Sequence, residues 1–511
     1  MPFLRLPIAL TAAAIAASTI VSAQGGVPPL RTLLSDTALP GIDTGVREND
    51  PPRRNSLAAS DPSLPYLRGS IVVKFKPGTA PASQQLMLQH VGASTTMDAP
   101  SYADFNIIAI DPAADPEAVA SELAKQPDIE YAQARYRVHP MFVPNDPLYP
   151  MQWNFPAIDM EHAWDLNQGA SASVVVAVID SGVAFRNEVV RFTAPPFQAV
   201  DSRGNTVAFP ALGTVDVPFA AAPDLGSADR YVSPRDFIWN DNDPVDLDGH
   251  GTHVTGTIGQ LTNNSQGVAG MAFNVRIMPV KVIDSIWDDI FGSPFQGTDD
   301  VVARGVHYAV DNGAKVLNMS IGRTGPPSPM LQEALIYATS HGAFVAIAGG
   351  NDFEDGNPVE WPANYANAIP GAVAVGAIGR DRLHAYYSSA GPYVELVAPG
   401  GNERTGGTQG GILQQTFDFS VVETYINGPA QYRAPRFDVF ADQFFQGTSM
   451  AAPHVAGFAA LLYQQGITNP AAIEAAMEQF ATDLGPTGRD NQYGYGLINP
   501  RASLRGLGLA K

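Results

Sequence analysis

Val174-Val175-Val176-Ala177-Val178-Ile179-Asp180-Ser181-Gly182 is an uninterrupted apolar run that ends in an acid and a glycine turn. Such a run is typical of a strand buried on both faces, as in a parallel sheet covered by helices on each side. Similar runs follow at Val275–Val280, Val316–Ser320 and Phe344–Ala348, with helical stretches between them. We therefore expect an α/β fold, a doubly wound and mostly parallel sheet, with reactive groups at the carboxyl ends of its strands.

The amino-acid composition excludes several kinds of binding partner and of chemistry. The chain has 511 residues, a net charge of −20 and no cysteine. That length allows two or three units. Because nucleic acids and anionic membranes attract clustered Lys and Arg, we expect neither as a partner. The lack of cysteine excludes disulfides, a thiol nucleophile and cysteine-ligated zinc.

The first residues resemble a targeting segment. Arg5 precedes an apolar, Ala-rich run from Pro7 to Val21, and Val21-Ser22-Ala23 follows as a cleavage motif. We expect residues 1–23 to be a signal peptide, so that the protein is secreted, extracellular or periplasmic, and free of the membrane in its mature form. The alternative is an uncleaved membrane anchor.

Two further segments precede the α/β domain. Residues 24–65 are rich in Pro, Ser, Asp and Arg, which predicts a flexible linker. Residues 66–140 carry strands and helices in the order β-α-β-β-α-β, the pattern of a small α+β ferredoxin-like unit. The domain that follows, residues 141–511, contains two stretches, 186–231 and 400–440, that we expect to be long loop-rich insertions.

Two motifs place an acid and a histidine at the edges of elements. Asp180 ends the first strand, where it can orient a partner; alternatively, it caps the next helix. Asp248-Gly249-His250-Gly251-Thr252-His253 holds two histidines three residues apart. A zinc motif would space them by four with a glutamate beside the first, so we favour His250 as a base and His253 as packed structure.

A third motif places a serine at a turn into an Ala-rich helix. It runs Gly447-Thr448-Ser449-Met450-Ala451-Ala452-Pro453-His454. At a helix start, free backbone N–H groups and the positive end of the helix dipole face any oxyanion formed when Oγ of Ser449 attacks a carbonyl. The alternative is a plain N-cap serine. We expect His454 to lie in the core.

The strings around Asp180, His250 and Ser449, in that order, resemble those of the subtilase (peptidase S8) family. The resemblance extends to further strings, Val316–Gly322, Ala348-Gly349-Gly350-Asn351, Val397–Gly400 and Tyr493–Asn499, and spans nearly all of residues 145–499. It implies a serine endopeptidase that hydrolyses polypeptide substrates through a Ser449 acyl-enzyme and uses no cofactor for the chemistry.

The same resemblance implies further roles. Asn351 would be the side-chain donor of the oxyanion hole, unless it only takes a left-handed turn conformation. The segments 318–322 and 348–350 would form the walls of the pocket for the residue before the scissile bond. They carry no charge, which favours an apolar or broad preference. Residues 66–140 would be an inhibitory propeptide that the enzyme removes from itself, rather than a permanent accessory domain. We expect a monomer.

One acidic run is compatible with two kinds of structure. Residues 240–248 resemble a calcium-binding loop of some subtilases, because their hard carboxylate oxygens suit calcium; a solvated turn is the alternative. The competing functions are an inactive protease-fold binding protein and an esterase. An esterase of the α/β-hydrolase type would carry Gly-x-Ser-x-Gly, with Ser before Asp before His, and this chain does not.

Overall fold

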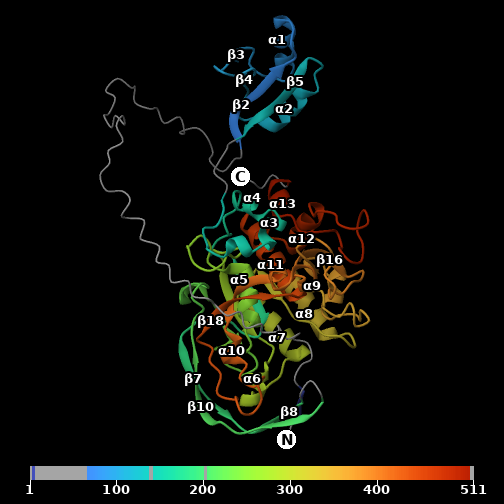
Figure 1. Ribbon diagram of the computed structural model, residues 1–511. Coiled ribbons are helices and arrows are strands. Elements are labelled where there is room, and N and C mark those ends of the chain that lie inside the picture. The colour runs from blue at the N-terminus through green and yellow to red at the C-terminus, as the bar shows by residue number, and fades with distance from the viewer. Residues whose placement is uncertain (1–2, 6–65, 137–141, 201–203, 507–511) are drawn as a thin grey trace, which may run out of the picture. The chain divides into compact units, whose positions relative to one another are not determined.

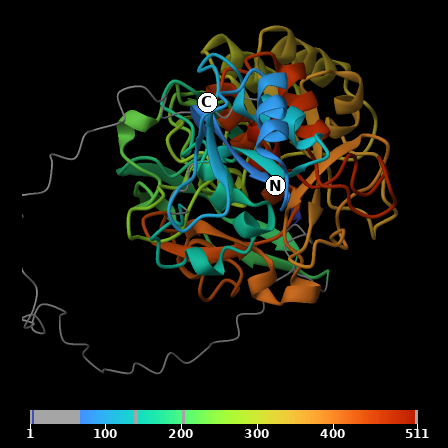
Figure 2. The same ribbon diagram turned by 90° about the horizontal axis from the view of Figure 1, so that it is seen from above.

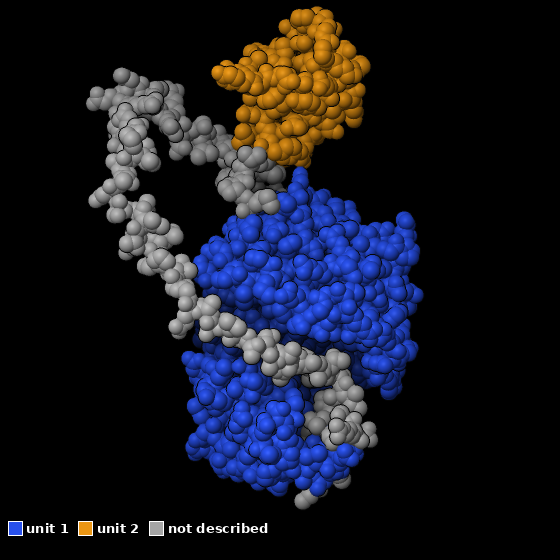
Figure 3. Space-filling model, viewed as in Figure 1, with its two compact units in different colours: residues 1–6, 138–511 blue, residues 7–137 orange. Residues whose placement is uncertain are grey.

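The computed structural model describes residues 3–5, 66–136, 142–200 and 204–506, the first of these by backbone alone. The chain divides into two compact units, one of residues 7–137 and one of residues 1–6 with 138–511 (Figure 3). The predicted linker and most of the predicted signal peptide lie outside the described residues. Within the latter, β1 (Phe3–Arg5) pairs in parallel with β8 (Phe197–Val200).

The smaller unit has the predicted β-α-β-β-α-β order (Figures 1 and 2). Over residues 66–136 its antiparallel sheet has the strand order β3-β4-β2-β5. Its elements are β2 (Tyr66–Phe75), α1 (Pro81–His90), β3 (Met97–Asp98), β4 (Asn106–Ala109), α2 (Pro116–Ala124) and β5 (Ile129–Tyr136). Ile71 and Val73 alternate with less buried residues along β2 and pack against Leu88 of α1 and Leu123 of α2, so this unit has its own core.

The larger unit is built on the predicted parallel sheet. Within residues 142–200 and 204–506 the sheet has seven strands in the order β11-β12-β6-β13-β14-β15-β16. They are β11 (Arg235–Asp236), β12 (Arg276–Lys281), β6 (Val175–Asp180), β13 (Val316–Met319), β14 (Phe344–Ala348), β15 (Ala372–Ile378) and β16 (Val394–Pro399). Every residue of β6, β13, β14, β15 and β16 is buried, because helices cover both faces of the sheet.

Helices on the two faces have different partners. α5 (His250–Gly259) and α11 (Thr448–Gln464) contact each other, and so do α7 (Asp299–Asp311) and α8 (Pro329–Ser340); β6 contacts both α5 and α7, and β14 contacts both α11 and α8 (Figure 1). Nearly every residue of α11 through Leu462 is buried, so this helix is the centre of the core. The remaining helices are α3 (Asn154–Ala157), α4 (Met160–Trp164), α6 (Ile286–Phe291), α9 (Glu403–Gly406), α10 (Phe419–Val422), α12 (Pro470–Gln479) and α13 (Pro500–Gly506). In the part of the chain that the structure describes, no helix has the length and apolarity to cross a membrane.

The two insertions contain more regular structure than the sequence predicts. The first forms antiparallel pairs of β7 (Glu188–Ala194) with β10 (Gly213–Phe219) and of β8 with β9 (Thr206–Phe209). The second is bounded by the pair β17 (Ile412–Phe417) and β18 (Phe440–Phe445). The insertions meet where Phe219 stacks on Phe437, with ring centroids 5.0 Å apart. Their short strands become stable through this shared aromatic packing, which local sequence does not reveal.

Candidate active site

Asp180 is the last residue of β6, at the carboxyl edge of the sheet. Its side chain is fully buried, and Oδ1 accepts a hydrogen bond from the backbone N–H of Ser181 at 2.7 Å. Oδ1 also lies 2.7 Å from Nδ1 of His250. In the neutral form of the imidazole, the nitrogen that faces this acceptor carries the proton, so Nδ1 donates to Oδ1 and Nε2 keeps a free lone pair. Asp180 therefore orients the histidine and does not cap a helix.

His250 is the first residue of α5, directly after Gly249 in a left-handed conformation (φ 104°). The next residue must be a glycine, because a Cβ added at Gly251 would lie 2.2 Å from the carbonyl oxygen of Gly182. This close approach lets the start of α5 lie directly against the end of β6. The flanking glycines thus place the imidazole beside Asp180.

Asp246 forms hydrogen bonds both to the turn after Asp180 and to the start of the helix at His250, a role that the sequence did not reveal. It is fully buried, and its carboxylate accepts hydrogen bonds from the Ser181 hydroxyl at 3.0 Å, from the N–H of Gly249 at 2.8 Å and from both the N–H and the hydroxyl of Thr252. The cue in the sequence was an acid two residues before Asp248-Gly249-His250. Its hydrogen bonds fix the entry to α5 relative to β6.

The charges around His250 favour its protonated form. Burial lowers the pKa of the imidazole, but the charge and hydrogen bond of Asp180, followed by the charges of Asp248 and Asp246, outweigh it and raise the pKa to about 9. The side chain is still 25% exposed. A base with this pKa is free of its proton mainly in alkaline solution.

Ser449 is the second residue of α11, and its side chain is half-buried. Its hydroxyl donates to the backbone carbonyl of Ser320 at 3.2 Å, so it does not cap the helix; among the described residues it makes no hydrogen bond to His250. Pro453 lies inside the helix, beyond its first turn. A proline there cannot donate to the carbonyl of Ser449, and the Ser320 hydroxyl donates to that carbonyl instead, at 2.8 Å. Ser320 therefore holds Ser449 by two hydrogen bonds.

Asn351 lies beside the start of the same helix. Its Oδ1 accepts from the N–H of Thr448 at 2.9 Å and from the Thr448 hydroxyl at 3.0 Å. This fixes the amide so that Nδ2, on the opposite side from Oδ1, remains available as a donor on an exposed side chain. Asn351 is not among the non-glycine residues with positive φ, whereas Gly350 before it has φ 109°. The alternative of a left-handed asparagine is therefore wrong.

These groups reach one edge of the sheet through three neighbouring strands. β13 pairs in parallel with β6 on one side and with β14 on the other. Asp180 ends β6, Ser320 follows β13, and Asn351 lies shortly after β14. Because α11 begins against Ser320 and Asn351, Ser449 reaches the edge at which Asp180 holds His250.

The other two histidines of the motifs are structural. Nε2 of His253 lies 3.1 Å from the carbonyls of Ile412 and Gln443, and burial lowers the pKa of this histidine to about 3. His454 contacts Asn154 and Met450, and burial lowers its pKa to about 4. Both side chains are fully buried, as predicted.

The acidic run 240–248 does not fit a calcium site. The carboxylate of Asp243 pairs with the guanidinium of Arg186, and Oδ1 of Asp241 accepts from the N–H of Asp243 at 2.8 Å. Asp246 is occupied by the donors described above. These carboxylates turn toward groups of the protein instead of converging on a common point, as calcium would require.

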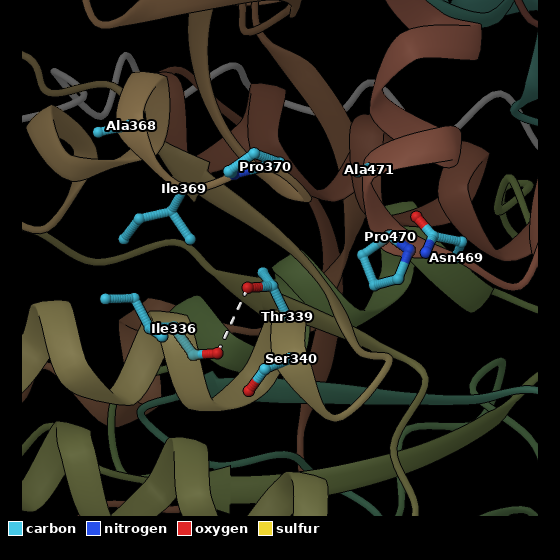
Figure 4. Close-up of a pocket in the computed structure, with 9 residues that line it drawn as sticks. All are labelled: Ile336, Thr339, Ser340, Ala368, Ile369, Pro370, Asn469, Pro470 and Ala471. Atoms are coloured by element: carbon cyan, nitrogen blue, oxygen red, sulfur yellow. Dashed lines mark hydrogen bonds between the residues drawn. The ribbon is translucent and has the colours of Figure 1, made fainter.

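A separate hollow of about 280 Å³ lies between the end of α8 and the start of α12 (Figure 4). Its lining includes Thr339, Ser340 and Asn469 but no titratable side chain, and Thr339 donates to the carbonyl of Ile336. It contains none of the predicted site residues. Nothing in its lining supplies a nucleophile with a base.

Comparison with known proteins agrees with this geometry. The model of the subtilase family matches residues 171–496, and that of the fervidolysin N-terminal prodomain matches residues 52–134. The chain is 32% identical to a thermophilic serine proteinase of Bacillus sp. (strain AK1), over 85% of this chain and 86% of the relative. It is also 32% identical to thermitase of Thermoactinomyces vulgaris, over 68% of this chain and 94% of the relative.

Solved structures give the same result. A protease of Pseudoalteromonas arctica PAMC 21717 superposes with a TM-score of 0.53 and 27% identity, covering 72% of this chain and all of that one. Fervidolysin of Fervidobacterium pennivorans shares the fold, with a TM-score of 0.50 and 24% identity over 86% of this chain and 61% of that one. The chain therefore belongs to the subtilase family of serine proteases and carries an N-terminal prodomain before its protease domain.

Proposed function

We propose that the protein is a secreted serine endopeptidase in which Ser449 is the nucleophile, His250 the general base, Asp180 the group that orients this base, and Asn351 an oxyanion donor. The observation that carries the assignment is the hydrogen bond between Asp180 and Nδ1 of His250, which leaves Nε2 free to take a proton. Ser449, held at a helix start at the same edge, is the hydroxyl that supplies this proton.

In the proposed reaction, Nε2 of His250 removes the proton of the Ser449 hydroxyl as Oγ attacks a peptide carbonyl. Nδ2 of Asn351 and the N–H of Ser449 donate to the oxyanion that forms. The imidazolium then gives its proton to the leaving amine, an acyl-enzyme remains, and water hydrolyses it. This chemistry needs no cofactor.

The test is Ser449→Ala, which removes the attacking oxygen. The variant should lose casein hydrolysis, and a serine-directed phosphonate should label Ser449 in the wild type alone. Ser340→Ala, at the exposed end of α8, is the matched control and should keep full activity. Residual turnover within about tenfold of wild type, with contaminating protease excluded, would contradict the assignment.

We propose in addition that residues 1–23 are a signal peptide, 24–65 a linker, 66–140 an inhibitory propeptide and 141–511 the catalytic domain. Secretion is supported by the name of one relative, the extracellular protease of Xanthomonas campestris pv. campestris, 29% identical over 76% of this chain and 62% of the relative. The separate core of the small unit supports an independently folded propeptide. The enzyme would cut itself near residues 139–144 and keep the product bound as an inhibitor.

Residues 66–140 expressed alone should inhibit the mature enzyme in trans, and Ser449→Ala should accumulate uncut at the junction. The measurements are progress curves with added fragment and mass spectrometry of the purified chains. A fully active wild type that still holds Val73 and Ser449 on one covalent chain would contradict the propeptide assignment.

A further inference from the structure

Two glycine segments lie beside the proposed oxyanion donor. Gly322 follows β13, and Gly350 immediately precedes Asn351 after the neighbouring strand β14. Gly322 is exposed and Gly350 half-buried. These are the two segments for which the family resemblance predicts the walls of the pocket for the side chain before the scissile bond.

The carboxyl group of Glu360 lies beneath these segments. A Cβ added at Gly350 would lie 2.2 Å from Cγ and 2.8 Å from Cδ of Glu360, and one added at Gly322 would lie 3.8 Å from its Oε2. The backbone fixes this position, because Trp361 and Arg323 exchange two hydrogen bonds of 2.8 Å. The lack of a side chain at Gly350 is what leaves room for the glutamate.

No cationic side chain among the described residues pairs with Glu360. Its side chain is 3% exposed, and its Oε1 accepts no hydrogen bond from any described residue. The nearby guanidinium of Arg323 is held by Asp299 and by the carbonyls of Thr324 and Pro326. A buried carboxyl oxygen without a donor is unfavourable, so the site gains free energy when a donor enters.

We propose that Glu360 makes the enzyme prefer a lysine or arginine side chain immediately before the scissile bond, an inference that rests on the proposed protease function. The ammonium or guanidinium group would donate to the unpartnered Oε1, and the aliphatic stem would lie along the glycine segments. The uncharged segments 318–322 and 348–350 alone predicted an apolar or broad preference for the residue before the scissile bond. Glu360 belongs to neither segment and reaches them from another loop.

The preference should grow with pH. Burial, followed by the hydrogen bond and then the charge of the neighbouring Asp352 carboxyl, raises the pKa of Glu360 to about 8. The other titratable group that faces it is the hydroxyl of Tyr393, which donates to the carbonyl of Gly349 at 3.3 Å. A bound cation favours the ionised form of Glu360, so below pH 8 binding must first release a proton. The selectivity for lysine therefore rises as the pH rises through about 8.

The test compares two peptide p-nitroanilides that differ only in the residue before the anilide, lysine in one and the neutral isostere norleucine in the other. At pH 9.5 the wild type should show a kcat/KM for the lysine substrate about tenfold to a hundredfold above that for norleucine. The ratio should fall at pH 7. The titration of His250 cancels in this ratio, because both substrates use the same base.

Glu360→Gln should lose the lysine preference and keep its kcat/KM for norleucine within about threefold. Glu354→Gln is the matched control, since Glu354 lies in the same loop but is exposed and pairs with Arg404, and it should keep the preference. If Glu360→Gln does not fold, as judged by its melting temperature, the wild-type ratio decides alone.

A wild type that prefers norleucine at pH 9.5, or a folded Glu360→Gln that still prefers lysine, would overturn the inference and leave the proposed protease intact. Absence of any Ser449-dependent hydrolysis by the wild type would overturn both.

Discussion

Asn351 offers the sharpest separation of a catalytic from a structural role, because its two amide atoms have different tasks. Oδ1 accepts hydrogen bonds from both the N–H and the hydroxyl of Thr448 at the start of α11, whereas Nδ2 is the atom proposed to donate to the oxyanion. Asn351→Ala removes both functions. Asn351→Asp keeps an acceptor for Thr448 and replaces only the donor, with a side chain of the same shape.

The expected magnitudes follow from this division. Loss of one oxyanion donor costs about 3–4 kcal/mol in the transition state, or a fall in kcat of roughly 10²–10³, with little change in KM. Both variants should show it, and Asn351→Asp at least as strongly because a carboxylate repels the oxyanion. The two hydrogen bonds to Thr448 contribute about 1 kcal/mol each to folding, so only Asn351→Ala should also lose thermal stability.

The assay pairs steady-state kinetics on a peptide p-nitroanilide with thermal unfolding of both variants in an inhibited state. A normal kcat in Asn351→Asp, together with a lowered melting temperature in Asn351→Ala, would refute the catalytic role and leave Asn351 as a support for α11. A large loss of kcat in a fully stable Asn351→Asp is the expected result.

Two further predictions concern charge. Because the pKa of His250 is raised to about 9, kcat/KM on a substrate with a neutral residue before the scissile bond should rise about tenfold per pH unit up to that value. Asp248→Asn removes one of the negative charges that raise this pKa and should move the acid limb to lower pH; an unmoved or raised limb would contradict the electrostatic account. Lys281→Met should destabilise the fold by about 3–5 kcal/mol in urea unfolding, because fully buried Lys281 lies 2.9 Å from the equally buried carboxylate of Asp288, which would be left unpaired. A loss below about 1 kcal/mol would show that the pair does not contribute in this way.

The sequence alone predicted four of the seven strands of the parallel sheet and their alternation with helices, but not the other three strands or the strand order. The runs that become β6, β12, β13 and β14 are mostly apolar, a local pattern that is typical of a parallel strand covered on both faces. The helices and strands of residues 66–136 could also be predicted from the sequence, because the strands alternate apolar with polar residues and the second helix is amphipathic. Glycines near Asp180, His250 and Ser449 marked the tight turns that carry the reactive side chains. The sequence reveals such turns because a single residue without a Cβ is enough to let two backbone segments approach closely.

Tertiary structure alone decided which side chains meet. Ser320 pairs with Ser449 across 129 positions of sequence, and Thr448 with Asn351 across 97, contacts that no local pattern encodes. The acidic run 240–248 had the composition of a cation site, yet Arg186 and the turn into α5 take up its carboxylates. Glu360 gave no signal in the sequence, since an isolated glutamate is usually solvated. Its burial beneath two glycine segments arises only when the loop after β14 folds back against Arg323, because long-range backbone pairing sets the environment of a charge.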